Sequence, residues 1–393
     1  MIRHNLKKGS FFLYFTVLAA ALTTSNLAHA VPGRAPTAIE RSQVTVSSLS
    51  QLNHVLRRID RATAILVAPG RYGGLSISNL KVPFGTVIRS ADQDRPAVFD
   101  GLYLRGVNGL SIKNINVIPP ASGLVNGRYG ALVLNSRNVK LEALRIAGPG
   151  GSINRKFDTA MMLRSSSDIT VFRSYFTNFK HGLSMLNLEN SLIEANEFES
   201  LQTDAIRGGG IHDTTIRSNV ITNLSPARYD HPDGIQLWSN HQSEPGRNIT
   251  IADNLIVRGR GGPIQGIFVR DTKLKLPFEN LVIEGNLVLG GMYNGISVGG
   301  ANGVRVVDNM VIPRTDQKSW IRLENVRKAT TADNSAGAYI FRNNREEPRS
   351  SGNTTIEATD RNMAGTISRW TREKAVFASY RGRVLLRLMK DGL

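Results

Sequence analysis

The middle of the chain repeats one short hydrophobic pattern. The stretches that carry it are "TAMMLRS" from Thr159, "HGLSMLN" from His181, "TDAIRGG" from Thr203, "PDGIQLW" from Pro232, "QGIFVRD" from Gln265 and "NGISVGG" from Asn294. In each stretch a small residue precedes an apolar one, and a second apolar position usually follows two residues later. The first apolar position holds Met161, Leu183, Ile206, Ile235, Ile267 and Ile296. This alternation with a period of two predicts strands that bury one face.

A second column of identical residues accompanies these strands. An asparagine recurs in register in "LIEANEF", "TIRSNVI", "TIADNLI", "VIEGNLV" and "RVVDNMV", at Asn196, Asn219, Asn254, Asn286 and Asn309. The steps between them are irregular, which suits coils of one basic length with loops inserted into some. Stacked amides can hydrogen-bond from coil to coil at a bend. We therefore predict an all-β fold, a right-handed parallel β-helix over residues 31–345, with coils about 4.8 Å apart.

Both ends of the chain differ from this solenoid. Residues 1–30 have a basic start, the apolar run "FFLYFTVLAAAL" and small residues at Ala28 and Ala30. They predict a secretory signal peptide cleaved after Ala30, because the apolar run is too short for an ordinary membrane-spanning helix. The stretch "SQLNHVLRRIDRATAILVAPGRYGG" predicts an N-terminal cap, a short helix followed by a first strand. Residues 346–393 form a basic tail, which we expect to cover the last coil as a helix rather than to bind a membrane surface.

Composition narrows the choice of partner. The chain of 393 residues has no cysteine and a formal net charge of +18, so it has no disulfides and favours a polyanion. An ordinary basic surface is the plainer alternative. Export to the periplasm or the medium makes nucleic acid an unsuitable partner and leaves no membrane contact after cleavage. We expect a monomer that acts on an acidic polysaccharide.

Groups that can titrate or bind charge gather on about three neighbouring coils. Asp204 and Asp233 share a column just before the small residue, and His181 precedes them in it. Arg207 and Gln236 share the outward column two residues beyond the small one. Further candidates are Lys180 beside His181, Tyr229 and His231 in the inserted loop, and His212 on the next bend. Each could be an ordinary capping or surface residue, but together they predict a functional site.

The chain resembles the carbohydrate-active β-helix proteins, namely polysaccharide lyases of the pectate and alginate type and mannuronan C5-epimerases. The stretch "YDHPDG" is loosely similar to an epimerase motif, with a different order of Asp, Pro and His. The resemblance implies a site built from Tyr229, His231, Asp233 and Lys180.

Lyases and epimerases both remove the proton at C5 of a uronic acid, after the adjacent carboxylate has been neutralised. Arg207 with Gln236 is the candidate neutraliser, and His231 or Lys180 is the candidate base. Tyr229 would protonate the leaving oxygen in a lyase. Asp204 and Asp233 would orient the histidine or bind calcium, although no dense acidic loop is present and no cofactor is required.

The remaining candidates would bind substrate. Arg164 and Arg270 lie on flanking coils, and Trp238 is an exposed aromatic residue near the ladder. We therefore predict a lyase that cleaves an alginate-like or pectate-like polymer by β-elimination. The alternatives are a C5-epimerase, a polygalacturonase-like hydrolase that uses Asp204 and Asp233, and a non-catalytic glycan-binding solenoid.

Overall fold

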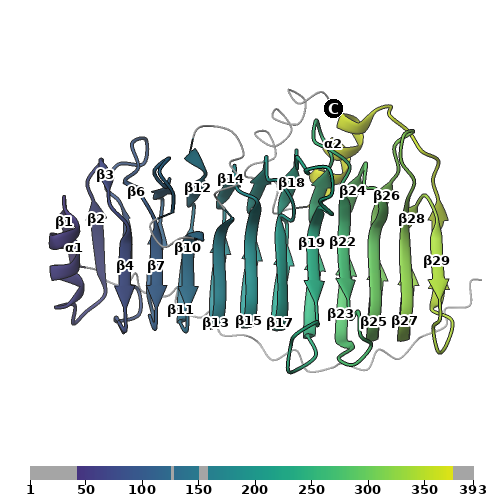
Figure 1. The fold of residues 1–393 in the computed structure, drawn as a ribbon, viewed down its shortest axis with the longest axis horizontal. Coiled ribbons are helices and arrows are strands. Elements are labelled where there is room, and N and C mark those ends of the chain that lie inside the picture. The colour runs from purple at the N-terminus through teal and green to yellow at the C-terminus, as the bar shows by residue number, and fades with distance from the viewer. Residues whose placement is uncertain (1–41, 125–127, 150–157, 375–393) are drawn as a thin grey trace, which may run out of the picture. The chain divides into compact units, whose positions relative to one another are not determined.

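The structure is a computed structural model that describes residues 42–124, 128–149 and 158–374. About half of these residues form the strands of two parallel β-sheets, of 19 and 12 strands, that are wound from one continuous chain (Figure 1). The strands are parallel and form a right-handed coil, which confirms the predicted all-β parallel β-helix.

The larger sheet contains β1 (Ser42–Val46), β2 (Thr63–Val67), β4 (Leu75–Ser78), β5 (Val87–Ser90), β7 (Leu102–Arg105), β8 (Ser111–Lys113), β10 (Tyr129–Leu134), β11 (Arg137–Glu142), β13 (Thr159–Phe172), β15 (His181–Glu194), β17 (Ile206–Arg217), β19 (Asp233–Trp238), β20 (Arg247–Ala252), β22 (Gln265–Arg270), β23 (Phe278–Glu284), β25 (Tyr293–Val307), β27 (Ser319–Ala332), β29 (Tyr339–Arg342) and β30 (Arg349–Ser351). The smaller sheet contains β3 (Arg71–Tyr72), β6 (Val98–Phe99), β9 (Asn116–Val117), β12 (Arg145–Ala147), β14 (Tyr175–Thr177), β16 (Glu197–Glu199), β18 (Val220–Thr222), β21 (Leu255–Val257), β24 (Leu287–Leu289), β26 (Met310–Ile312), β28 (Ser335–Ala336) and β31 (Thr354–Thr355).

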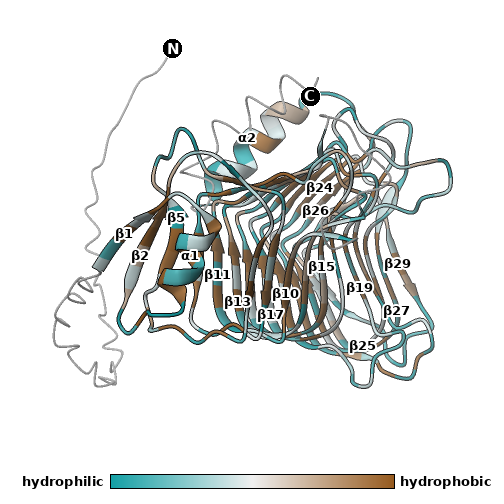
Figure 2. Cartoon of the chain, turned by 60° about the vertical axis from the view of Figure 1, so that its left-hand side comes forward, coloured by the Kyte–Doolittle hydropathy of each residue, from teal (hydrophilic) through white to brown (hydrophobic). Residues whose placement is uncertain are grey.

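The register of the strands matches the predicted columns. Met161 pairs with Leu183, Leu183 with Ile206, and the column continues through Ile235, Ile267 and Ile296. All of these side chains are buried in the core, and Figure 2 shows hydrophobic colouring along the strands of the solenoid. The outward column is also as predicted, because Ser184, Arg207 and Gln236 pair in turn.

The long strands β13, β15, β17, β25 and β27 turn a corner within the larger sheet, where residues adopt positive φ. Asn187, Gly210, Gly300 and Asn325 occupy this bend, a conformation that glycine and asparagine tolerate best. A later bend leads into the smaller sheet and carries the predicted asparagine ladder. There the amide Nδ2 of Asn219 donates to Oδ1 of Asn254 at 3.0 Å, and the same contact repeats from coil to coil. The ladder extends further than predicted, through Asn334 to Asn353.

The column of small residues has a steric cause. A Cβ atom on Gly182 would lie 2.3 Å from the carbonyl oxygen of Ala205 on the next coil, and one on Gly266 would lie 2.1 Å from that of Gly295. The backbones approach too closely here for a larger side chain. The same holds after Asp233, where a Cβ atom on Gly234 would lie 2.9 Å from the carbonyl oxygen of Gly266.

The two ends of the solenoid depart from the sequence-based expectations in detail. The capping helix is present as α1 (Leu49–Leu56), and its Leu52 and Leu56 join the core, but β1 precedes it and pairs with β2. At the other end β30 and β31 still pair with β27 and β28, so the predicted boundary at residue 345 is too early. The polar stretch after it forms short exposed strands that carry no hydrophobic alternation.

The tail helix covers a different surface from the one predicted. Helix α2 (Met363–Glu373) places Met363, Ile367 and Trp370 in one apolar cluster with residues of the smaller sheet, among them Leu255 and Leu287. It therefore covers the outer face of β18, β21, β24 and β26 rather than the end of the last coil (Figures 1 and 2). The apolar side chains that point outward from these strands supply the reason.

Two sequence-based expectations lie outside the described residues. These are the signal peptide at residues 1–30 and the part of the basic tail after Lys374. Within the residues that are described, helices are too short or too polar to cross a bilayer.

Candidate functional site

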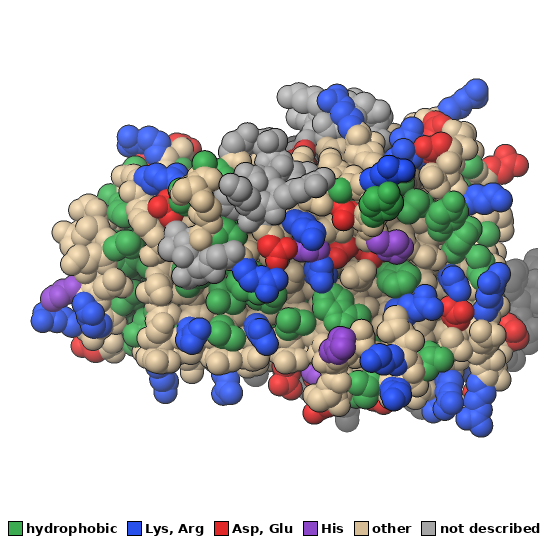
Figure 3. Space-filling model, viewed as in Figure 1, with side chains coloured by type: hydrophobic (Ala, Val, Ile, Leu, Met, Phe, Trp, Pro, Cys, Tyr) green, Lys and Arg blue, Asp and Glu red, His purple; other side chains and the backbone are tan. Residues whose placement is uncertain are grey.

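A groove of about 570 Å³ crosses the outward face of the coils that contain β10, β13, β15, β17 and β19. Its lining includes the basic residues Arg128, Arg164, Lys180 and Arg207. On the face shown in Figure 3, histidine and acidic side chains lie near the middle with lysine and arginine around them. Asp158, Asp204 and Asp230 also line the groove, so consecutive coils contribute four basic and three acidic side chains to one joint surface.

His181, Asp204 and Arg207 are in direct contact in this groove. Arg207 Nη1 lies 3.1 Å from Asp204 Oδ2 and 3.0 Å from His181 Nδ1. The carboxylate of Asp158 approaches the other ring nitrogen of His181 at 3.8 Å. Trp238 lies under the Arg207 guanidinium, with 5.1 Å between Cζ and the ring centroid. These contacts fix the cation and the imidazole side by side at the floor of the groove.

The environment of His181 favours its neutral form. Burial, together with the charges of Arg207 and Lys180, lowers the pKa of His181 from 6.5 to about 3. The imidazole is therefore neutral at working pH, which is the form that a general base needs, but so low a pKa makes it a weak base until a bound carboxylate raises that pKa. Burial also raises the pKa of Asp204 above its ordinary value, against the opposing effect of Arg207.

Asp233 lies one coil further on and is completely buried. Burial, and then the charge of Asp204, raises the pKa of Asp233 to about 6. Gln236 Nε2 donates to Asp233 Oδ2 at 2.6 Å. The other carboxylate oxygen, Asp233 Oδ1, is buried without a hydrogen-bond partner among the described residues. The backbone N–H of Asp233 donates to Asp204 Oδ1 at 3.1 Å, which joins the two acids through the main chain.

His231 lies at the mouth of this second cluster. Its Nδ1 is 3.9 Å from Asp233 Oδ2, and the Asp233 carboxylate raises the pKa of His231. Gln265 Nε2 lies 2.8 Å from the same ring nitrogen. Gln265 in turn accepts from Asn294, and Trp320 Nε1 donates to Asn294 at 3.1 Å. A polar chain therefore continues from the site toward the C-terminal coils.

The structure brings most of the predicted residues together but not all. Lys180, His181, Asp204, Arg207, Arg164 and Trp238 line the groove, and Asp233, Gln236 and His231 form the adjoining cluster. Tyr229 is 87% exposed in the loop before β19, with its ring against Arg228. His212 lines a separate pocket with Glu189, Glu244 and Arg247. Arg270 faces Glu324, with 3.9 Å between the charged atoms.

Sequence reasoning missed part of the groove. Arg128, Tyr129, Asp158 and Asp230 line it, and Arg128 forms an ion pair with Asp158 at 3.3 Å. The signal for Tyr129 is present in the sequence, because "YGALVLN" continues the hydrophobic pattern one coil earlier. Asp230 belongs to the inserted loop, whose path no repeat specifies.

Metal binding finds no support in side-chain clusters. Among the residues that the structure describes, no group of three or more His, Cys, Asp or Glu side chains is arranged to hold a metal ion. Asp204 and Asp233 have instead protein hydrogen-bond donors on several of their oxygens.

Comparisons with known proteins identify the fold. A family profile described as "Right handed beta helix region" matches residues 100–311. A comparison with curated protein sequences finds no match.

Solved structures of several kinds share this fold at low sequence identity. A mannuronic acid specific polysaccharide family 6 lyase from human gut microbiota is 15% identical with a TM-score of 0.53, and the match covers 84% of this chain and 90% of that one. The Dettilon tailspike protein is 12% identical with a TM-score of 0.53, over 79% of this chain and 62% of that one. A surface adhesin of Streptococcus pneumoniae is 10% identical with a TM-score of 0.50, over 81% and 93%. The feature that these structures share with the chain is the solenoid fold, which occurs in both an enzyme and an adhesin.

Proposed function

Because the chain belongs to the family of right-handed β-helix proteins, we propose that its groove is the active site of an exported polysaccharide lyase. The substrate would be an acidic polysaccharide built from uronic acids, of the alginate or pectate kind. The observation that carries the proposal is a neutral, buried histidine held beside an arginine in a groove lined by four basic residues.

The basic residues suit the substrate charge. Arg207 would meet the carboxylate of the uronate at the reaction centre, since a guanidinium matches a carboxylate with two parallel hydrogen bonds. Neutralising that carboxylate makes the C5 proton more acidic, which is the difficult part of the reaction. Arg164, Lys180 and Arg128 would attract the neighbouring uronates of the polymer.

His181 is the base that this geometry favours, in place of His231. Its imidazole would take the proton from C5, and the electron pair left behind would form the C4–C5 double bond as the bond from C4 to the glycosidic oxygen breaks. The leaving oxygen must then gain a proton. Tyr129 also lines the groove, two coils before His181 in the same column, and its phenol is the candidate donor. We propose Tyr129 in place of Tyr229, which is 87% exposed and does not line the groove.

Hydrolysis by a pair of aspartates fits the site less well. A hydrolase needs two carboxyl groups that face the glycosidic bond from its two sides. The side chain of Asp233 is completely enclosed and accepts a hydrogen bond from Gln236. Only a rearrangement of this coil would expose it to a sugar.

The test is an ultraviolet absorbance assay for unsaturated uronates on a panel of polymannuronate, polyguluronate, polygalacturonate and a neutral glucan. We expect absorbance to rise with at least one uronate polymer and with no neutral one, and binding to weaken with salt. Arg207→Ala should lower turnover about 100-fold, the usual scale for loss of an electrostatic stabiliser.

Arg322→Ala is the matched control, because Arg322 occupies the same outward column on a distant coil and pairs with Glu324. It should leave turnover unchanged. Tyr129→Phe should slow elimination, whereas Tyr229→Phe should not. New reducing ends without absorbance would assign a hydrolase instead, and a changed C5 configuration without cleavage would assign an epimerase.

A further inference from the structure

A second pocket with positive charge lies on the C-terminal coils, away from the groove. It has a volume of about 350 Å³ and is lined by the loop after β22 and by the bends that follow the outward strands of β25, β27 and β29. From the coil of Arg207 to those of β25 and β27 the chain makes three to four turns of the solenoid, roughly 15–20 Å at the spacing of parallel strands. The two sites therefore share no residue.

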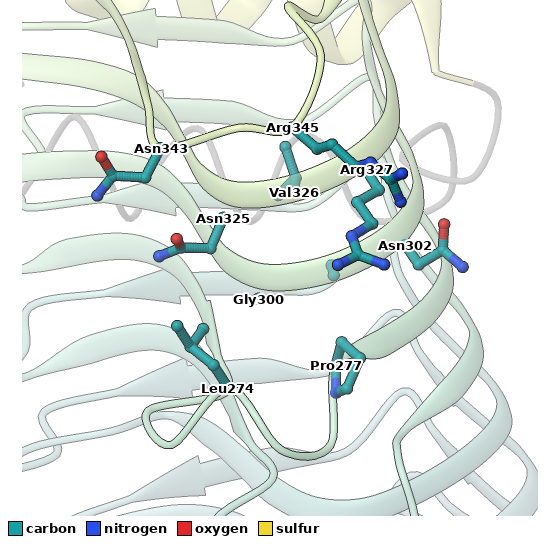
Figure 4. A pocket seen from close by; sticks show the side chains of 10 residues that line it. Leu274, Pro277, Gly300, Asn302, Asn325, Val326, Arg327, Asn343 and Arg345 are labelled. Carbon is teal, nitrogen blue, oxygen red and sulfur yellow. The ribbon is translucent and has the colours of Figure 1, made fainter.

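Two arginines define one side of this pocket. Arg327 of β27 and Arg345, which follows β29, extend there together with Asn302 of β25 (Figure 4). Within the described part of the chain, neither guanidinium has an ion pair or a hydrogen bond with the protein. Glu279 lies next to Asn302 in the same column, and Glu346 follows Arg345, yet neither carboxylate comes within ion-pair distance. Two like charges are thus held on one pocket without a counter-charge.

The asparagines of the pocket add no polar group for a ligand. Asn325 and Asn343 have positive φ, and their amides point away from the arginines in Figure 4, so the backbone bend explains them. Asn302 differs, because its Oδ1 is buried and has no hydrogen-bond partner in the described chain. This oxygen is covered by protein, so the two guanidinium groups are the polar groups that the pocket offers to a ligand.

The opposite wall is apolar. Leu274 and Pro277 form it, and Leu274 is 54% exposed. Gly300 allows this close approach, since a Cβ on it would lie 3.2 Å from Cδ2 of Leu274. A ligand that fits must therefore combine an anionic group with an apolar face.

We propose that this pocket binds one anionic sugar residue of an acidic polysaccharide, at a site separate from the groove. The carboxylate would bridge Arg327 and Arg345, and the C–H face of the ring would pack on Leu274 and Pro277. The choice of a sugar acid rests on the proposed function, whereas the anion site itself rests only on the pocket.

Calorimetric titration separates the two sites. The probe is a saturated tetrasaccharide of a uronic acid, compared with a neutral tetrasaccharide and with inorganic sulfate. His181→Ala, which should bind the acidic probe without cleaving it, should show two sites, and Arg207→Ala should retain one. In the Arg207→Ala background, Arg327→Ala and Arg345→Ala should each weaken that remaining site at least ~10-fold, as expected for loss of a charge-assisted hydrogen bond.

Arg305→Ala is the matched control, because Arg305 is an exposed arginine of β25 outside the pocket, and it should leave the remaining site unchanged. Unchanged binding in both arginine variants would overturn the proposal. Equal affinity for the neutral tetrasaccharide, or for sulfate, would overturn the assignment to a sugar acid. Loss of one site in Arg327→Ala with no effect of Arg207→Ala would leave this pocket standing and remove the proposed function of the groove.

Discussion

Two polar ladders run through the same coils at different bends, and they obey opposite rules. The asparagine ladder from Asn196 to Asn353 repeats one residue, and each amide is satisfied by the next. The ladder of His181, Asp204, Asp233 and Gln265 contains three residue types on four successive coils. It contains shifted pKa values and a buried carboxylate oxygen without a partner.

The difference follows from what each ladder must do. A stack of identical amides supplies every coil with the same donor and acceptor. Its hydrogen bonds therefore satisfy buried polar groups without burying any charge. A stack of unlike titratable groups places ionisable side chains in the protein interior. Burial there disfavours their charged forms, which destabilises the fold. Such an arrangement is typical of a site where chemistry requires it. Regularity marks structure here, and its interruption marks the candidate site.

The largest expected effect is on the regular ladder. In Asn254→Ala, the amides of Asn219 and Asn286 and the carbonyl of Ile216 lose a partner inside the core. Each orphaned buried group costs about 1–3 kcal/mol, so the free energy of unfolding should fall by about 3–5 kcal/mol. Urea denaturation measures it, and Thr250→Ala, an outward position in β20 on the same coil, should change it by about 0.5 kcal/mol or less. Equal losses in the two variants would show that the ladder has no special role.

The next effect is on catalysis at the irregular ladder. His181→Ala should lower kcat/KM by about 100–1000-fold, the scale of a lost general base, with little change in the urea midpoint. The acid side of the wild-type pH profile gives a second readout. Because the pKa of His181 is lowered to about 3, the rate should not fall near pH 6.5 as it would with an ordinary histidine. A fall centred near or above pH 6.5 would instead point to His231, whose pKa is raised.

A smaller effect concerns the cost of the buried acid. The folded-state pKa of Asp233 is raised to about 6 from 3.8, so its contribution to stability is present at low pH and is lost as pH rises from about 4 to 6. Asp233→Asn keeps an acceptor for Gln236 and removes that loss. Above pH 6 the variant should be more stable than the wild type by on the order of 1–3 kcal/mol, and at pH 4 the two should be nearly equal. Parallel stability curves for the two proteins would contradict the assignment.

The sequence predicts the regular features well and the irregular ones poorly, for a physical reason. The column of Ile206, Ile235 and Ile267 repeats, so a period of two and one alignment place every strand and its register. The inserted loop before β19 has no repeat, and its Tyr229 is exposed where a catalytic role was expected. The sequence favours His231 or Lys180 as the base, because the burial that keeps His181 neutral is set by neighbouring coils that the repeat pattern does not describe.

The tail shows the same limit. An amphipathic helix could be expected from the pattern of residues 363–373, but not the surface that receives it. That surface is made by single outward apolar residues on separate coils, such as Leu255 and Leu287, which only the fold brings together.

The smallest expected effect is on the pKa of His231, the exposed residue beside the irregular ladder. His231 is exposed, and its pKa is raised chiefly by Asp233, which lies below it. Removing the charge in Asp233→Asn should therefore lower the pKa of His231 toward its ordinary value, as read from the imidazole proton signals in an NMR titration. Gln265→Met removes the amide that contacts the same ring but no charge, so it should leave that pKa nearly unchanged. If the two variants shift the pKa of His231 equally, the charge of Asp233 has no special effect on that pKa. The irregular ladder would then differ from the asparagine ladder less than its residues suggest.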